Sequence, residues 1–160
     1  MSAWRKKASA DLGRLGVDAD ALFAHLAKAN HLRRPGAPWR KKLIALVPAA
    51  EAIAVLLRPF TPAGALRPRE DAAAAFGAIW ASLEFGGPDL LGVIAELVPW
   101  CQKELGTSHQ AATVGVMVLG LWPDDTRPIL EQFRDDASLK SLIATVRAAL
   151  RRQAEAHPKG

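Results

Sequence analysis

The stretch Gln110-Ala-Ala-Thr-Val-Gly-Val-Met-Val-Leu-Gly-Leu121 decides the fold of this 160-residue chain. Wound as an α-helix, it has apolar side chains on nearly every side, which is typical of the central helix of a bundle. A β-strand over 113–119 is the competing interpretation, because three valines alternate there. The rest of the chain offers no second strand for it to pair with. We therefore predict a helix and an all-α fold.

Towards the C-terminus, the pattern predicts a turn, a short helix and a long final helix. The turn is Trp122-Pro-Asp-Asp, and Pro128 starts a short helix that runs to Arg134. Asp136 is the expected N-cap of the last helix. The buried stripe of that helix is predicted to be Leu139, Leu142, Ile143, Val146, Ala149 and Leu150.

Upstream of the central stretch, proline and glycine mark the helix ends. Pro68 is expected to open a helix that ends at Gly86-Gly87-Pro88. A helix over 89–98 should then be interrupted by Pro99 before a short piece that stops at Gly106. Thr107 or Ser108 is expected to cap the central helix. The buried face of the helix after Pro68 is predicted to be Ala72, Phe76, Ile79, Trp80 and Leu83.

The first quarter of the chain shows helical periodicity in three segments. Segment 2–15 has an apolar stripe, a second helix capped by Asp18 should end near Asn30, and a third should start at Pro38. Pro48 either kinks the third helix or starts a new one over 49–57. The expected buried residues of the three segments are Trp4, Ala8, Leu12 and Leu15, then Leu22, Phe23, Leu26 and Ala27, then Trp39, Leu43, Leu46 and Val47.

We predict one helical domain over 1–160, built as a compact bundle of about seven or eight short helices with proline- and glycine-broken connections. Half of the residues are apolar, which suffices for a core. The expected parts are a basic helical hairpin (1–34), a linker (35–38), the main bundle (39–156) and a tail (157–160).

Composition narrows the cellular context. Cys101 is the sole cysteine, so an intrachain disulfide is excluded. The basic N-terminus lacks the apolar run of a signal peptide, and the apolar stretch 43–57 is shorter than a membrane span and contains Pro48 and Glu51. We expect a cytoplasmic protein with no integral membrane segment. The bias towards Ala, Arg, Pro and Gly is typical of a GC-rich bacterial genome.

Charge is segregated along the chain. Residues 1–42 carry ten lysines and arginines against three aspartates, a net charge of +7, whereas residues 43–136 carry −6 and residues 137–160 carry +4. Two basic ends thus flank an acidic middle. Such asymmetry indicates an anionic partner, or self-association into an oligomer or larger complex through unlike patches.

The tetrapeptide Trp-Arg-Lys-Lys occurs at 4–7 and again at 39–42. In one interpretation the two tryptophans anchor the core and the cations are ordinary solvent-facing residues. In the other, the first and third helices pack side by side and their cations form one face for an anionic partner. That predicted face consists of Arg5, Lys6, Lys7, Arg33, Arg34, Arg40, Lys41 and Lys42.

Signals for catalysis are sparse. No histidine has a histidine or cysteine at metal-ligand spacing, and we expect no metal or cofactor. Cys101 and His109 flank a predicted helix break and could form a nucleophilic dyad, although a buried structural cysteine is the favoured interpretation. The pattern Arg152-Gln-Ala-Glu-Ala-His157 resembles the Arg-x4–6-His motif of HEPN ribonucleases, which are all-helical. The resemblance implies that Arg152 and His157 act on an RNA phosphodiester, usually across a dimer.

Three function classes remain. We predict a non-enzymatic binding protein that contacts the nucleic-acid phosphate backbone through the basic N-terminal face, without sequence-specific recognition. The alternative is a protein–protein adaptor, immunity or assembly subunit whose cations meet an acidic protein surface. A peripheral membrane binder that uses Trp4 and its basic neighbours is the third class.

Overall fold

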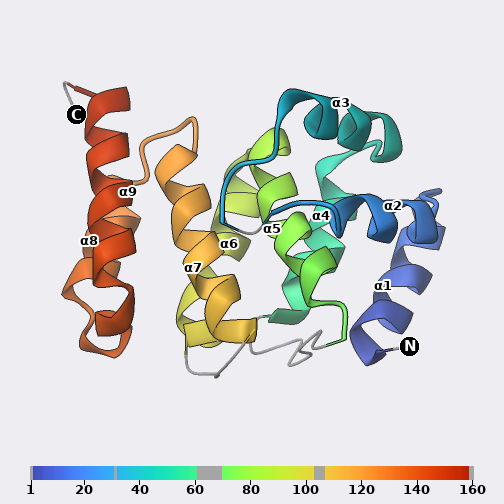
Figure 1. Ribbon diagram of the computed structural model, residues 1–160, viewed down its shortest axis with the longest axis horizontal. Coiled ribbons are helices and arrows are strands. Elements are labelled where there is room, and N and C mark those ends of the chain that lie inside the picture. The colour runs from blue at the N-terminus through green and yellow to red at the C-terminus, as the bar shows by residue number, and fades with distance from the viewer. Residues whose placement is uncertain (1, 31, 61–69, 103–106, 159–160) are drawn as a thin grey trace.

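A computed structural model describes residues 2–30, 32–60, 70–102 and 107–158, apart from the side chains of 107–109 (Figure 1). Over these ranges the chain is all-α, as predicted, and contains no strand. The helices are α1 (Ala3–Arg14), α2 (Ala19–Leu26), α3 (Ala37–Leu46), α4 (Ala50–Leu57), α5 (Ala72–Phe85), α6 (Pro88–Gln102), α7 (Thr107–Leu121), α8 (Arg127–Asp135) and α9 (Ile143–Ala156), with 3-10 helices η1 (Arg58–Phe60) and η2 (Ala137–Leu142).

Two helices form the centre of the bundle. α7 packs against α5, α6 and α9, which confirms the predicted central helix and rules out the strand alternative. α5 is equally central, because every residue from Ala74 to Leu83 is buried. The sequence predicted a one-sided buried face for α5. Its alanines and Gly77 have small side chains, so neighbouring helices approach it from several directions.

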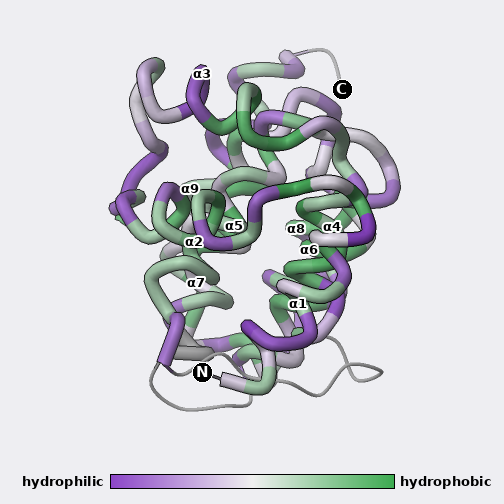
Figure 2. The backbone as a smooth tube through the Cα atoms, turned by 90° about the vertical axis from the view of Figure 1, so that its right-hand side faces the viewer, coloured by the Kyte–Doolittle hydropathy of each residue, from purple (hydrophilic) through white to green (hydrophobic). Residues whose placement is uncertain are grey.

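The remaining helices surround this centre. In Figure 1, α8 and α9 lie at one end of the long axis, α1 and α2 lie at the other, and α3 crosses the top. Figure 2 shows hydrophobic residues along the inner helices and hydrophilic stretches on α1 and α3. Among the described helices, none alone is long and apolar enough to cross a membrane; α3 and α4 together pass that test by length and composition but are bent by 97°.

The end of α1 departs from the predicted stripe. Trp4, Ala8 and Leu12 are buried as expected, but Leu15 is 39% exposed. The cause is Gly16, whose positive φ of 74° turns the chain immediately after the helix. The amide of Val17 then donates to the carbonyl of Leu12, and Val17 enters the core in place of Leu15.

The end of α2 also differs from prediction. Asp18 is the N-cap, as predicted, and its carboxylate accepts from the Ala21 amide at 3.1 Å. The helix ends at Leu26 and not near Asn30, and Ala27 is exposed. The chain leaves the helix there in successive turns, in which the amides of residues 28 and 29 bond to the carbonyls of residues 25 and 26.

Two prolines behave differently from each other. After Pro48 the chain starts a new helix, α4, which confirms the second of the two predicted outcomes and not a kink within one helix. Pro99 does not interrupt α6, which continues to Gln102, and the predicted break is wrong. Proline removes one hydrogen bond, but the buried residues Leu97, Val98 and Cys101 hold this part of α6 in the core.

The C-terminal third follows the sequence closely. α8 matches the predicted short helix, while Asp136 caps the 3-10 helix η2 that leads into α9. Of the predicted stripe, Ile143 and Leu150 are only partly buried. α7 begins at Thr107, three residues before Gln110. The predicted helix start at Pro68 and stop at Gly106 lie outside the described residues.

Gln153 is a buried polar residue that the sequence did not reveal. Its side-chain amide donates to the carbonyls of Leu119, Gly120 and Trp122 at 3.3, 3.0 and 3.0 Å. Its carbonyl oxygen accepts from the Thr126 amide at 3.0 Å. One side chain of α9 therefore satisfies buried backbone groups at the C-terminal end of α7 and at the N-cap of α8.

Candidate anion-binding surface

The eight predicted cations do not form one face. Three lie on α1, two lie in the segment before α3, and three lie on α3. α1 packs mainly against α2 and α4, whereas α3 packs against α2 and α5. Both views place α3 at the top of the molecule and α1 in the lower half (Figures 1 and 2). The side-by-side packing on which the prediction depended is therefore absent.

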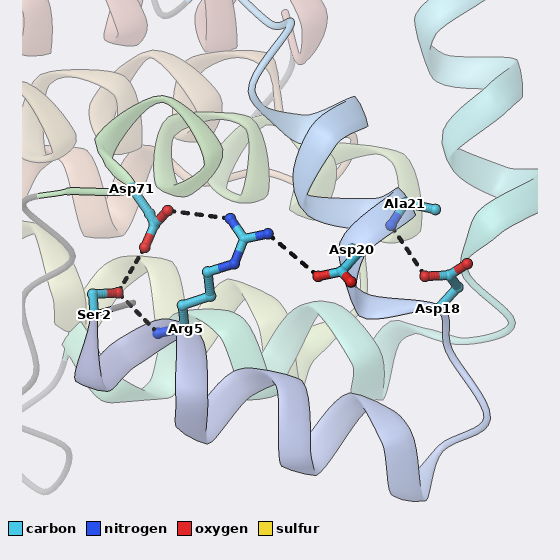
Figure 3. A network of polar contacts seen from close by, with 6 residues as sticks. All are labelled: Ser2, Arg5, Asp18, Asp20, Ala21 and Asp71. Carbon is cyan, nitrogen blue, oxygen red and sulfur yellow. Dashed lines mark hydrogen bonds and ion pairs between the residues drawn. The ribbon is translucent and has the colours of Figure 1, made fainter.

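Arg5 has a role inside the fold. Its guanidinium lies 3.3 Å from Asp71 and 3.4 Å from Asp20, and 4.5 Å above the ring of Phe23 (Figure 3). Ser2 caps α1 and also donates to Asp71 at 2.6 Å. This network ties α1 to the N-terminal ends of α2 and α5. Two carboxylates therefore already match the charge of Arg5.

The rest of the first basic run is partly matched. Lys7 lies 3.5 Å from Asp11, which also accepts from Arg14 at 2.7 Å. Lys6 is exposed and has no ion-pair partner in the described part of the chain. Trp4 is buried, and its indole nitrogen donates to the carbonyl of Leu56 at 2.9 Å. Its ring is thus a core anchor, as one interpretation predicted, and is not available for insertion into lipid.

The second basic run is more open. Arg34 and Arg40 share the carboxylate of Glu84, at 3.0 and 3.8 Å. Lys41 and Lys42 are exposed and form no ion pair with any described residue. Arg33, in the segment before α3, is likewise exposed and unpaired among the described residues. These three cations remain available to an external anion.

The structure adds one cation to this group. A hollow of about 200 Å³ is lined by Lys28, Arg33, Arg34 and Trp39, among others. Lys28 and Lys42 both lie close enough to His25 to repel a proton there. We define the basic surface as Lys28, Arg33, Arg34, Arg40, Lys41 and Lys42. Lys28 is not one of the eight cations predicted from the sequence.

A reciprocal pair of hydrogen bonds holds α3 against α2. The ring nitrogen Nε2 of His25 donates to the carbonyl of Trp39 at 2.8 Å, and the indole of Trp39 donates to the carbonyl of His25 at 3.0 Å. The two rings stack with centroids 4.9 Å apart. Trp39 is only half-buried, so it anchors α3 to His25 at the edge of the core. This pairing positions Lys41 and Lys42.

We expect the pairing to make stability depend on pH. Nε2 of His25 must carry a proton to donate this bond, and Nδ1 is buried with no hydrogen-bond partner in the described part of the chain. Burial, followed by repulsion from Lys42 and Lys28, lowers the pKa of His25 below 6.5, although the bond to Trp39 opposes this. Below pH 6.5 the unfolded chain therefore binds a proton that the folded chain resists, and the free energy of unfolding should fall as pH decreases.

Urea denaturation across this pH range measures the effect. His25→Gln keeps a donor for the Trp39 carbonyl but does not titrate, so its stability should vary less with pH than that of the wild type. Parallel pH profiles for the two proteins would show that His25 is not responsible.

The structure describes the side chains of three of the four residues considered for catalysis. Cys101 is buried, and the side chain of His109 is not among those described, so the proposed dyad stays a prediction. Arg152 is exposed on α9, and His157 is the half-buried C-cap of that helix. In the described ranges, no group of three or more histidine, cysteine or acidic residues could hold a metal ion.

Comparison with known proteins leaves the surface to be interpreted from its own geometry. No protein-family model, curated protein or solved structure matches this chain.

Proposed function

We propose that the protein binds the phosphate backbone of nucleic acid through the basic surface. The observation that supports this is the gathering of six cations from α3 and from the segment that connects α2 to α3. Three of them, Arg33, Lys41 and Lys42, have no carboxylate partner within the described residues. Lysine and arginine side chains that reach phosphates release condensed counterions, which supplies affinity for any sequence.

The basic surface is built from lysine and arginine side chains, which can contact phosphates whatever the base sequence. α3 contains neither asparagine nor glutamine, the side chains that pair with adenine edges. Contacts from lysine to phosphate fix position on the nucleic acid but carry no sequence information. The proposed role is therefore that of a subunit that associates with DNA or RNA without sequence preference.

Replacing Lys41 and Lys42 with glutamine should weaken nucleic-acid binding about tenfold at low salt, because two phosphate contacts are lost. The slope of log affinity against log salt should decrease by about two, roughly one for each contact. Fluorescence anisotropy with labelled single- and double-stranded DNA and RNA measures both quantities.

The chain offers a matched control. Lys6→Gln with Lys7→Gln removes the same charge from exposed positions on α1, away from the basic surface. This variant should bind like the wild type. Equal losses in the two double variants would indicate a non-specific charge effect, and an absence of binding at low salt would overturn the proposal.

A specific observation favours an acidic protein partner as the second candidate. Leu32 and Ile44, 65% and 51% exposed, lie next to the cations in sequence, and Ile44 follows Arg40 by one helical turn. Apolar contacts inside a ring of complementary charge are typical of protein interfaces. Leu32→Ser with Ile44→Ser should abolish a nuclease-resistant complex while leaving anisotropy titrations unchanged.

A further inference from the structure

A groove of about 430 Å³ lies between the segment before α3 and helices α5, α7 and α9. Its apolar lining includes Leu32, Trp80, Met117 and Leu121. In Figure 1, the segment between α2 and α3 runs towards α7 before it returns to α3. The volume lies in the range of small-molecule sites, which are mostly apolar with a few polar groups.

The charged residues that line the groove are all positive. They are Arg33 and Arg34 from the segment before α3 and Arg152 from α9. Arg34 is paired with Glu84, but Arg33 and Arg152 have no ion-pair partner among the described residues. The groove thus brings cations from the two basic ends of the sequence together beside an apolar surface. A carboxylate or phosphate head would complement them.

A second observation concerns Trp80. This residue lines the groove and is 1% exposed, and its indole N–H has no hydrogen-bond partner among the residues that the structure describes. The nitrogen atom is buried beneath the groove surface, so Trp80 contributes apolar ring surface to the groove.

We propose that the groove binds a small amphipathic anion, in which a carboxylate or phosphate head is attached to an apolar tail. Arg33 and Arg152 hold the head, and the apolar walls cover the tail. A nucleobase fits less well, because it carries several polar edge atoms and Thr145 is the only described residue lining the groove that has a neutral polar side chain without a large apolar ring. The proposal does not depend on nucleic-acid binding.

Isothermal titration calorimetry with four ten-carbon probes tests the proposal: decanoate, decyl phosphate, decanol and decyltrimethylammonium, each below its micelle-forming concentration. At least one of the two anions should bind, the alcohol should bind at least tenfold more weakly, and the cation should not bind. The tighter of the two anions identifies the head group. Equal binding of all four probes, or no binding of either anion, would overturn the proposal.

Two exposed arginines on one helix provide a matched pair of variants. Arg152 lines the groove, whereas Arg151 is exposed and does not line it. Arg152→Gln should weaken binding of the preferred anion at least tenfold, and Arg151→Gln should leave it unchanged. Equal affinities in the two variants would show that the arginine at the groove does not hold the head.

A further pair of variants separates the groove from the basic surface. Ala148→Phe places a ring in the groove and should abolish anion binding, with folding verified by circular dichroism. The double variant Lys41→Gln with Lys42→Gln should retain it. If the amphipathic anion binds and nucleic acid does not, only the function proposed above fails; the reverse result overturns the groove proposal alone.

Discussion

Gly77→Ala should destabilise the protein by about 3 kcal/mol, at the upper end of the cost of overpacking a core. A Cβ atom at this position of α5 would lie 2.1 Å from the carbonyl oxygen of Leu26 and less than 3 Å from the backbone carbons of that residue. Backbone atoms cannot rotate away as a side chain can. Either α2 must separate from α5 or the substituted helix must deform. Urea denaturation followed by far-ultraviolet circular dichroism measures the loss.

Gly92 is the matched control for Gly77. It lies inside α6, is exposed, and an added Cβ would meet nothing within 4 Å. Alanine is the better helix former, so Gly92→Ala should stabilise the protein by up to about 1 kcal/mol. Similar effects at the two glycines would mean that helix propensity, and not the α2–α5 contact, determines the result.

Gln153→Leu should also cost about 3 kcal/mol, because it leaves several buried backbone groups without partners. Leucine cannot accept the hydrogen bond that the Thr126 amide donates to Gln153. It also cannot donate to the carbonyls of Gly120 and Trp122. The carbonyl of Leu119 would keep its bond from the Thr126 hydroxyl at 2.7 Å. Leucine has a similar volume, so the loss reports hydrogen bonding more than packing.

Two further variants test the explanation for Gln153. Gln110→Leu, at an exposed position of α7, should change stability by no more than about 0.5 kcal/mol. Gln153→Glu places a carboxylate against backbone carbonyls, which raises its pKa in the folded state. The free energy of unfolding of this variant should therefore fall as pH rises above the usual pKa of a glutamate side chain. A flat pH profile would contradict the role assigned to the hydrogen bonds that Gln153 donates.

Local signals in the sequence predicted most of the helices. The cap at Asp18, the helix boundary at Pro48 and the buried stripe that begins at Trp4 were all predicted correctly. Each of these features depends on residues within one or two helical turns, so the local sequence is enough to predict it. Pro99 was misjudged because tertiary packing of α6 outweighs the missing amide. The side chain of Gln153 could not be assigned a role, because its partners lie 27 to 34 residues away in the chain.

The candidate site depended on information that the sequence does not contain. The cations were recognisable, but whether α1 and α3 lie together is decided by core packing. Glu84, which accepts from Arg34 across 50 residues of sequence, matches part of the charge. The pairing of His25 with Trp39 likewise had no sequence signal, because each residue alone is compatible with many environments. The groove beside Arg152 required the C-terminal helix to be placed in space.

The way α3 is attached has a consequence for how this protein would tolerate variation. Of its ten residues only Leu43 is buried, and the helix turns by 97° away from α4. Selection for folding therefore constrains few positions on α3, and its outer residues are free to drift. In a deep mutational scan that reads abundance and binding separately, Lys41 and Lys42 should be neutral for abundance. Any intolerance at these positions would then reveal selection for a partner.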